Sequence, residues 1–539
     1  MAVIAGATVD RVLFTGDSLT DSDAFFTAGG ALAAALAGPP VSDPTLAATL
    51  AALTAPPPPL GAGFGYGAGS AGAPSFSDGA VWADALGGRL GVAGGEATNY
   101  AVGSAEVLRE ETIAEALGIG APPLPEAGFR IDFAAQVERI LADTAGEDLS
   151  GTAVSVFIGL NDFARFAPST TNPLLALFEA AGYGAGTAEA TLAEAAPLAA
   201  AGVGAFVLHT LPGAGGLPAT SGLPEAEALG VDAVAGGYNA ALKAGAAALG
   251  AVGAGMEIVE TGAFLEEVGA DATAFGFRSA EPFLVNEPSA LDPVDFLSNF
   301  NPALLGAPRD QVAYWDPIHL SEALHGVLAS FVAESLTSRV EVGFGFGEIR
   351  FGGFGDDLVL SRGGDDLLRL LPGDDVALAG RGDDDVGAGF GHDLVIAGAG
   401  DDVVDGGWGH DVIADGDGRD LVRGRIGDDL LIDGAGDDVL RGGWGDDVMI
   451  FTEASLFARA PDGDDVVHGG RGRDTLVLRV ADAEADLGEA AVAGGVRFGA
   501  LGLTALGVEE ILVVEGTDLS GLSGLAVAGL ETAEAWNLA

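Results

Sequence analysis

Ser18 is the first residue of this sequence whose type and position suggest catalysis. It lies in the string Gly16-Asp17-Ser18-Leu19, directly after a short apolar run that we expect to form a strand over residues 11–14. A serine between a strand and a following helix can present its hydroxyl group as an exposed nucleophile. Serine in that position also commonly caps the helix, so the string alone leaves both roles open.

Three later blocks carry groups that a nucleophilic serine needs. Gly103 offers a backbone N–H that can approach a reacting centre, because glycine has no side chain in the way. Asn161 follows a predicted strand over residues 154–158, so its amide can donate a hydrogen bond at the carboxyl edge of a sheet. Asp316 and His319 stand three positions apart in a turn, where the carboxylate can orient the imidazole ring. Taken singly, Gly103 also fits a packing role and Asn161 a turn.

These residues need a framework that brings them together, and the sequence before residue 340 predicts one. Short aliphatic runs alternate there with alanine-rich stretches. We expect strands over residues 11–14, 154–158 and 205–208, and helices over residues 239–249 and 321–335. Strand and helix in alternation are typical of an α/β domain with a parallel sheet.

The four blocks, in this order over residues 16–319, resemble the GDSL lipase/esterase family, the SGNH hydrolases. The strings Asp78-Gly79-Ala80-Val81-Trp82 and Tyr314-Trp315-Asp316-Pro317 match flanking sequence common in secreted members. The resemblance implies a three-layer α/β/α, flavodoxin-like hydrolase domain, which we place at residues 8–338. An insertion over residues 27–77 exceeds what the simplest members carry, and it fits either a mobile flap or an ordered surface loop.

The same resemblance implies roles for the site residues. Ser18 Oγ attacks an ester carbonyl, His319 takes the proton and later gives it to the leaving alcohol, and Asp316 holds the imidazole tautomer. The backbone N–H groups of Ser18 and Gly103 and the Asn161 amide form the oxyanion hole. No metal or other cofactor is expected at this site.

After residue 340 the sequence becomes a glycine- and aspartate-rich repeat with a period of nine residues. In a frame that starts at Gly352, the fourth residue of each row is glycine, the sixth aspartate and the eighth apolar. Only the row at residues 451–459 departs, and the frame resumes in phase after it. A flexible acidic linker would not keep an apolar residue at every ninth position.

The period resembles the RTX family of calcium-binding repeats over residues 352–477, which implies an all-β parallel β-roll that we place at residues 345–478. Carboxylate oxygens are ligands that calcium prefers, and the resemblance implies several Ca²⁺ ions between coils of two rows each. Without calcium we expect the stacked aspartates to repel one another and the segment to unfold. The predicted ligands are the sixth-position aspartates Asp357, Asp366, Asp375, Asp384, Asp393, Asp402, Asp411, Asp420, Asp429, Asp438, Asp447, Asp465 and Asp474.

Composition excludes several functions. The chain has 79 acidic and 23 basic side chains, a net charge of −56, so binding to nucleic acid is not expected. It has no cysteine, which excludes thiol catalysis and thiolate metal sites. Its longest nearly uncharged stretch, residues 24–77, is broken by Pro39-Pro40 and Pro56–Pro59, so no stable membrane span is expected.

Other polar and aromatic residues favour structural roles. His209 and His325 lie in a predicted strand end and a predicted helix, where a packed, non-catalytic histidine is the more common case. His392, His410 and His468 fall within repeat rows and are interpreted as solvated residues. Trp408 and Trp444 occupy the third position of their rows, and we interpret them as surface or stacking groups.

The tail, residues 479–539, is acidic and aliphatic, and similar segments after RTX repeats act as uncleaved type I export signals. We therefore expect an extracellular serine esterase or lipase that acts on a small-molecule or lipid ester and leaves the cell through type I secretion machinery. Two alternatives stay open. One is an O-acetyl esterase acting on polysaccharide, and the other is a non-catalytic, calcium-dependent surface or matrix binder.

Overall fold

The computed structural model falls into two compact units, Met1–Gly269 with Glu281–Leu336, and Ala270–Ala280 with Thr337–Ala539. The residues that it describes are 2–17, 81–92, 99–102, 105–110, 112, 115, 129–250, 253–282, 311–314, 318–452, 463–480, 489–515 and 530–538. Among the helices of these residues, none combines the length and the apolar character that a membrane span requires.

Four parallel strands form the sheet of the first unit, in the order β3-β4-β5-β6. They are β3 (Arg11–Gly16), β4 (Thr152–Phe157), β5 (Ala205–His209) and β6 (Gly255–Val259). All six residues of β4 are buried, which is typical of a parallel strand covered on both faces. The predicted strands and the predicted parallel sheet are confirmed. A small antiparallel pair, β1 (Ala2–Ile4) and β2 (Ala7–Val9), precedes the sheet.

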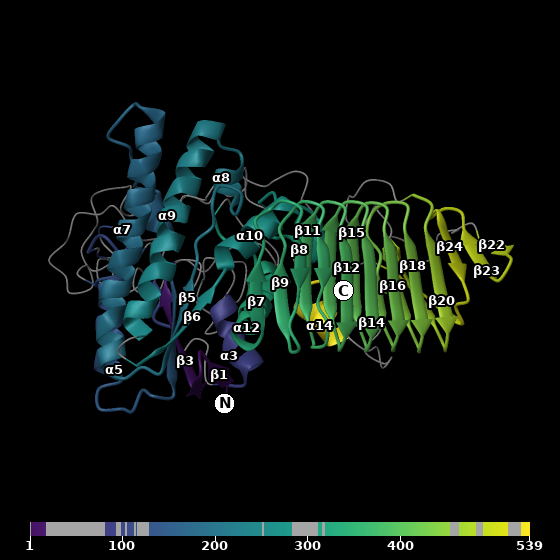
Figure 1. The fold of residues 1–539 in the computed structure, drawn as a ribbon, viewed down its shortest axis with the longest axis horizontal. Coiled ribbons are helices and arrows are strands. Elements are labelled where there is room, and N and C mark those ends of the chain that lie inside the picture. Colours follow the sequence, from purple (N-terminus) through teal and green to yellow (C-terminus); the bar gives the residue numbers. More distant parts are fainter. Residues whose placement is uncertain are drawn as a thin grey trace, which may run out of the picture. The chain divides into compact units, whose positions relative to one another are not determined.

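Helices lie on both sides of this sheet (Figure 1). On one side are α5 (Phe133–Asp143), α7 (Pro173–Ala200) and α9 (Glu225–Gly250), and on the other α3 (Trp82–Leu90), α10 (Thr261–Ala270) and α12 (Glu322–Thr337). The short helices α6 (Leu160–Phe163) and α8 (Pro218–Ser221) follow β4 and β5. The two longest helices, α7 and α9, touch through backbone. A Cβ at Gly184 would lie 1.9 Å from Val234 O, so only glycine allows this approach.

The second unit is a parallel β-roll of two facing sheets (Figure 1). One sheet contains β7 (Arg339–Val342), β9 (Asp357–Leu360), β11 (Val376–Arg381), β13 (Leu394–Ala399), β15 (Val412–Asp417), β17 (Leu430–Ile432), β19 (Val448–Thr452), β21 (Thr475–Val480) and β25 (Glu510–Glu515). The other contains β8 (Ile349–Phe351), β10 (Leu367–Arg369), β12 (Asp385–Phe390), β14 (Val403–Trp408), β16 (Leu421–Ile426), β18 (Val439–Trp444), β20 (Val466–Arg471), β24 (Leu503–Leu506), β23 (Gly495–Phe498) and β22 (Glu489–Val492).

The nine-residue period sets the register of these strands. Successive rows alternate between the two sheets, so each strand pairs with the strand two rows later, as in Val395 with Ile413. Two rows therefore complete one coil. The apolar eighth residue of each row points between the sheets, and Val404, Val422 and Leu440 have exposed fractions of 0, 1 and 0%. Burial of each such side chain stabilises the roll by roughly 1.5–3 kcal/mol.

The roll continues past the last repeat row. Strand β24 pairs with β20 and β25 pairs with β21, and β22 and β23 complete one edge as an antiparallel hairpin. Near the end of the chain, α14 (Leu530–Ala535) is followed by Asn537, whose Nδ2 donates to Phe275 O at 3.0 Å. Phe275 closes a 3₁₀ turn, Thr273–Phe275, that packs against β13 and β15. The assignment of this turn to the roll was not expected from the sequence.

Candidate active site and calcium-binding repeats

The structure describes two of the five predicted catalytic residues, Asn161 and His319. The other three, Ser18, Gly103 and Asp316, lie outside the described residues, as does the insertion at residues 27–77. The described residues next to them in the chain nevertheless form a connected set of hydrogen bonds at the carboxyl end of the sheet.

The last residue of β3, Gly16, is held by the side chain of Gln136. Gln136 Oε1 accepts from Gly16 N at 2.9 Å, and Gln136 Nε2 donates to Gly16 O at 2.8 Å. Gln136 is fully buried on α5, a helix whose N-terminus is capped by Asp132 Oδ1, which accepts from Ala135 N at 3.0 Å. Both polar groups of the Gly16 residue are thus fixed two positions before Ser18. Nothing in the local sequence pattern singled out Gln136.

The segment that precedes Gly103 runs along the free edge of β3. Phe14 forms a parallel bridge with Asn99, Tyr100 N donates to Phe14 O at 2.8 Å, and Val102 N donates to Gly16 O at 3.2 Å. The backbone just before Gly103 is therefore joined to the backbone just before Ser18.

Asn161 lies in the short helix α6, directly after β4. The turn into α6 depends on Gly159, whose φ of 122° lies in a region that other residues avoid. A Cβ at Gly159 would also lie 2.9 Å from Leu211 Cδ1. The half-buried Asn161 side chain donates from Nδ2 to Ala105 O at 3.2 Å, which connects α6 to the segment that follows Gly103.

Asp162 strengthens the same connection. Its Oδ2 accepts from Val107 N at 2.9 Å and its Oδ1 from Leu108 N at 3.0 Å, and its side chain is fully buried. Burial raises the pKa of Asp162 to about 6, while the two backbone hydrogen bonds act to lower that pKa. An ion pair between Glu106 and Arg165 lies beside it. Asp162 thus organises the backbone that follows Gly103.

His319 is buried, with 3% of its surface exposed, and lies just before α12. An antiparallel bridge joins Tyr314 to Leu320, the residue after His319, and Ser321 Oγ accepts from Leu324 N at 3.1 Å at the start of the helix. His325 is one turn further on and is also buried. Burial first, and the nearby His319 second, lower the pKa of His325 to about 3.

His209 has a structural environment, as expected. Its Nε2 is hydrogen-bonded to Ser155 Oγ at 2.9 Å and its Nδ1 to Thr261 Oγ1 at 2.8 Å. Its ring packs between Trp82 and Phe157, with centroid distances of 5.0 and 5.1 Å. Complete burial lowers the pKa of His209 to about 3, so the ring is neutral at physiological pH.

In the roll, the sixth-position aspartates form a buried ladder along the coils. From Asp357 to Asp447, the backbone N–H of each donates to Oδ1 of the aspartate one coil later, as from Asp384 to Asp402 at 2.7 Å and from Asp402 to Asp420 at 2.7 Å. Fifth-position residues form a second, exposed ladder in the opposite direction, as from Asp401 N to Asp383 Oδ1 at 2.9 Å. His392 and His410 replace aspartate in this exposed ladder and stack at 5.1 Å.

The buried ladder fits calcium. Each of its central aspartates uses Oδ1 for the hydrogen bond, and no described residue hydrogen-bonds to the buried Oδ2 of Asp375, Asp384, Asp393 or Asp402. Burial, followed by neighbouring carboxylates, raises the pKa of Asp393 to about 8, against the effect of the backbone hydrogen bond. Burial disfavours the charged form of these carboxylates, so bound cations are needed to keep them ionised. The sixth-position side chains, with Oδ2 available, are the groups that would hold these ions.

A second set of carboxylates was not predicted. Asp415 and Asp433 occupy the first position of their rows, and with Asp438 they place carboxylate oxygens within 4.8 Å of one another. All three side chains are buried. Three converging carboxylates are a donor set suited to a divalent cation. The signal in the sequence was the aspartate at a position that is glycine or uncharged in the other rows.

Comparison with known proteins agrees with this description. The model of the GDSL-like lipase/acylhydrolase family matches residues 12–332, which is more than half of the chain. The model of the RTX calcium-binding nonapeptide repeat matches residues 351–386, 378–413, 387–422, 415–449 and 462–477. No curated protein matches the chain.

One solved structure that matches is the extracellular lipase LipA from Serratia marcescens. It is 14% identical over 64% of this chain and 74% of its own, with a TM-score of 0.13, so it adds nothing to the assignment. The matches to the lipase family and to the repeat are sufficient to assign the chain. The chain is an ester-hydrolysing enzyme with calcium-binding repeats, and it belongs to the GDSL-like lipase/acylhydrolase family.

Proposed function

We propose that this enzyme hydrolyses carboxylic acyl esters with Ser18 as the nucleophile, His319 as the general acid and base, and Asp316 as the residue that orients His319. Ser18 Oγ attacks the carbonyl carbon while His319 takes its proton. The leaving alcohol then receives that proton, and water attacks the acyl-enzyme by the reverse sequence of transfers.

The observation that carries the proposal is the connection of β3 and β4 through the segment around Gly103. Gly16, at the end of β3, binds Val102, and Asn161, after β4, binds Ala105. Hydrogen bonds thus join the chain just before Ser18 to the chain just before Gly103, and the chain just after Gly103 to Asn161, the proposed third oxyanion donor. This supports an oxyanion hole made of the Ser18 and Gly103 N–H groups and the Asn161 amide. Each donor of that kind contributes about 3–4 kcal/mol in other hydrolases.

The repeats would serve folding and export in this proposal. The sixth-position aspartates hold calcium between coils, so the roll folds where calcium is abundant and stays unfolded where it is scarce. Such a calcium-dependent roll supports an extracellular location and export by type I machinery, with residues 479–539 as the signal. The limits of the hydrolase domain at residues 8–338 and of the roll at residues 345–478 are part of the same proposal.

Hydrolysis of a p-nitrophenyl ester series, from acetate to palmitate, tests the chemistry. Wild type and Ser18→Ala are compared side by side with calcium present. We expect turnover by the wild type and a loss of at least roughly a thousandfold in Ser18→Ala, with unchanged far-UV circular dichroism. Turnover retained by the folded variant would remove Ser18 from its role.

The chain-length profile distinguishes the substrate classes. A preference for long acyl chains identifies a lipase, and activity confined to acetate identifies a deacetylase of the kind that acts on polysaccharide. Asn161→Ala provides a second measurement. Loss of kcat with little change in KM is expected of an oxyanion donor, whereas a change in KM alone would contradict that role.

A further inference from the structure

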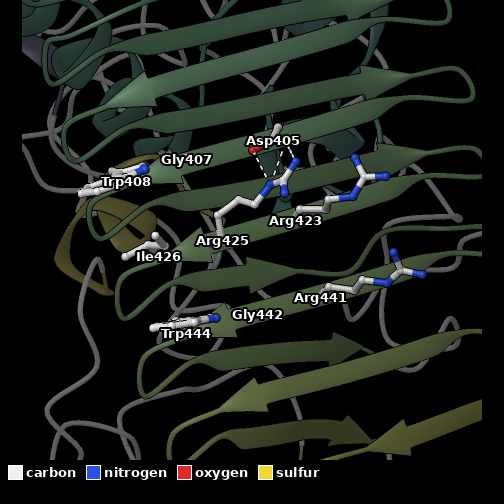
Figure 2. A pocket seen from close by; sticks show the side chains of 10 residues that line it. Asp405, Gly407, Trp408, Arg423, Arg425, Ile426, Arg441, Gly442 and Trp444 are labelled. Carbon is white, nitrogen blue, oxygen red and sulfur yellow. Dashed lines mark hydrogen bonds and ion pairs between the residues drawn. The ribbon is translucent and has the colours of Figure 1, made fainter.

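The outer face of the ten-stranded sheet carries a groove of about 710 Å³ over β14, β16 and β18 (Figure 2). Pairing between these strands places its side chains in rows that cross the sheet. Trp408, Ile426 and Trp444 form one row, here called the aromatic row. Asp405, Arg423 and Arg441 form a second, here called the basic row. The whole groove belongs to the roll.

The aromatic row is unusually exposed. Trp408 and Trp444 each expose 58% of their surface. They lie two strands apart, and therefore about 9.6 Å at the usual strand spacing. Phe390 extends the row at one end, 5.5 Å from the Trp408 ring, and the Arg471 guanidinium lies 4.6 Å from the Trp444 ring at the other. Exposed indole rings in a groove mark a binding surface more often than a packing accident.

The basic row is unusual for this chain, in which 79 acidic side chains face 23 basic ones. Three arginines line the groove against one aspartate. Arg425 is neutralised by Asp405, with Nε hydrogen bonds of 2.9 and 2.8 Å to its two oxygens. Arg423 and Arg441 lie side by side on neighbouring strands, and neither has an ion-pair partner among the described residues (Figure 2). Two parallel guanidinium groups of this kind are suited to bind carboxylates.

Folding does not explain these side chains. The roll requires the inward residue of each row, the buried aspartate and certain glycines. Gly407 and Gly443, for example, have φ values of 110° and 129°, and a Cβ on either would lie within 2.3 Å of a carbonyl oxygen. The outward positions at Trp408, Arg423 and Arg441 carry no such constraint. Gly407, Arg425 and Gly443 lie between the aromatic and basic rows, and of these three only Arg425 carries a side chain.

We propose that this groove binds an acidic polysaccharide, with sugar rings stacked on Trp408 and Trp444 and uronate carboxylates held by Arg423 and Arg441. The spacing of the two indole rings, two strands apart, suits alternate sugar rings of an extended chain, with the ring between them over Ile426. The basic row runs parallel to the aromatic row. A concave site suits a linear polymer better than a membrane surface, which requires protruding apolar groups.

This binding site is separate from ester hydrolysis and does not depend on the proposed catalytic residues. It would hold the enzyme on an acidic matrix. Esters of that matrix, or of lipids near it, would then be within reach of the enzyme. Its failure and the failure of the catalytic proposal are therefore distinguishable by experiment.

The test is isothermal titration calorimetry on the full, calcium-loaded chain. Hexagalacturonate is the acidic probe and maltohexaose is the neutral one. We expect hexagalacturonate to bind and to change tryptophan fluorescence, binding to weaken as salt rises, and maltohexaose to bind at least tenfold more weakly. Arg423→Ala with Arg441→Ala, and Trp408→Ala with Trp444→Ala, should each weaken hexagalacturonate binding by at least roughly tenfold.

Matched controls lie elsewhere on the roll. Arg419→Ala removes one exposed arginine that pairs with Asp401, and Phe354→Ala removes a ring that is 90% exposed. Both should leave hexagalacturonate affinity unchanged. Equal binding by the arginine double variant and wild type would overturn the assignment, as would equal affinity for maltohexaose. Binding to phosphatidylglycerol vesicles without binding to hexagalacturonate would make the groove a lipid-headgroup site and equally reject the proposal.

Discussion

Gln136 and Gly16 are joined by two reciprocal hydrogen bonds between residues 120 positions apart in the sequence. The amide of Gln136 satisfies both the N–H and the C=O of the residue that ends β3. Because both groups are buried, the loss of either partner would leave a polar atom without hydrogen bonds in the protein interior. The pair therefore fixes the exit of the chain from the sheet toward Ser18.

Gln136→Met should impair catalysis without removing any catalytic group. The variant keeps the volume of the side chain but loses both hydrogen bonds, which lowers the free energy of unfolding by about 1–3 kcal/mol. A displaced nucleophile lowers kcat by roughly 10- to 100-fold. Urea unfolding and p-nitrophenyl butyrate kinetics measure the two effects.

Thr191→Val is the control for that variant, because it removes the buried hydroxyl that donates to Thr187 O within α7. It should cost stability and leave kcat unchanged. If Gln136→Met lost stability alone, with wild-type kcat, the bond to Gly16 would not position the nucleophile.

Calcium should fold the roll through the buried aspartates and not through the exposed ones. Asp402→Asn removes a charge from the buried ladder, so the calcium concentration at half-folding should rise by roughly tenfold or more. The neighbouring Asp401→Asn removes a charge from an exposed side chain that pairs with Arg419, and it should have little effect. Far-UV circular dichroism during calcium titration, after removal of calcium with EGTA, compares them. Equal shifts for both variants would show that total charge, and not the buried ladder, controls folding.

Glycines at the fourth position of the rows should differ sharply in how far they tolerate substitution by alanine. Gly427 has a φ of 144°, and a Cβ there would lie 1.3 Å from Gly409 O in the preceding coil. Gly427→Ala should therefore destabilise the calcium-loaded roll by about 3 kcal/mol or more. Gly355 has no atom within 4 Å of a built Cβ, so Gly355→Ala should be nearly neutral. The midpoint of urea unfolding separates the two, and similar midpoints would contradict the close approach of the coils.

The buried His209 should make the hydrolase unit sensitive to acid. Its pKa is lowered to about 3 in the folded protein, whereas an unfolded histidine has a pKa near 6.5. Below pH 6.5 the unfolded chain binds a proton that the folded chain cannot accept, so stability falls with pH between about 6.5 and 3. The loss from pH 7 to pH 5 is about 2 kcal/mol for this residue.

His209→Gln removes that titration but preserves a polar side chain. Its stability should decrease less between pH 7 and pH 5 than that of the wild type, although His325 still contributes in both. Urea unfolding at the two pH values, followed by tryptophan fluorescence at saturating calcium, gives the difference. An identical decrease in both proteins would mean that His209 becomes protonated in the folded state.

The sequence alone was sufficient to identify the family, the α/β class of the first unit and the β-roll of the second. A period of nine residues is a one-dimensional pattern, and the inward position of residues such as Val404 and Leu440 follows directly from it. The catalytic blocks were likewise recognisable because each is a short contiguous string. Asn161 and His319 lie where the order of elements predicted, after β4 and before α12, while Ser18, Gly103 and Asp316 remain predictions.

Only the tertiary structure revealed the contacts that join distant segments. Gln136 has no local signal, since its role exists only because α5 packs beside the end of β3. The parallel rows of Trp408 with Trp444 and Arg423 with Arg441 arise because residues of alternate rows become neighbours across a sheet. Local patterns report which residues turn inward and where the chain bends. Which outward side chains meet is decided by the pairing of strands, and that pairing depends on the packing of the whole coil.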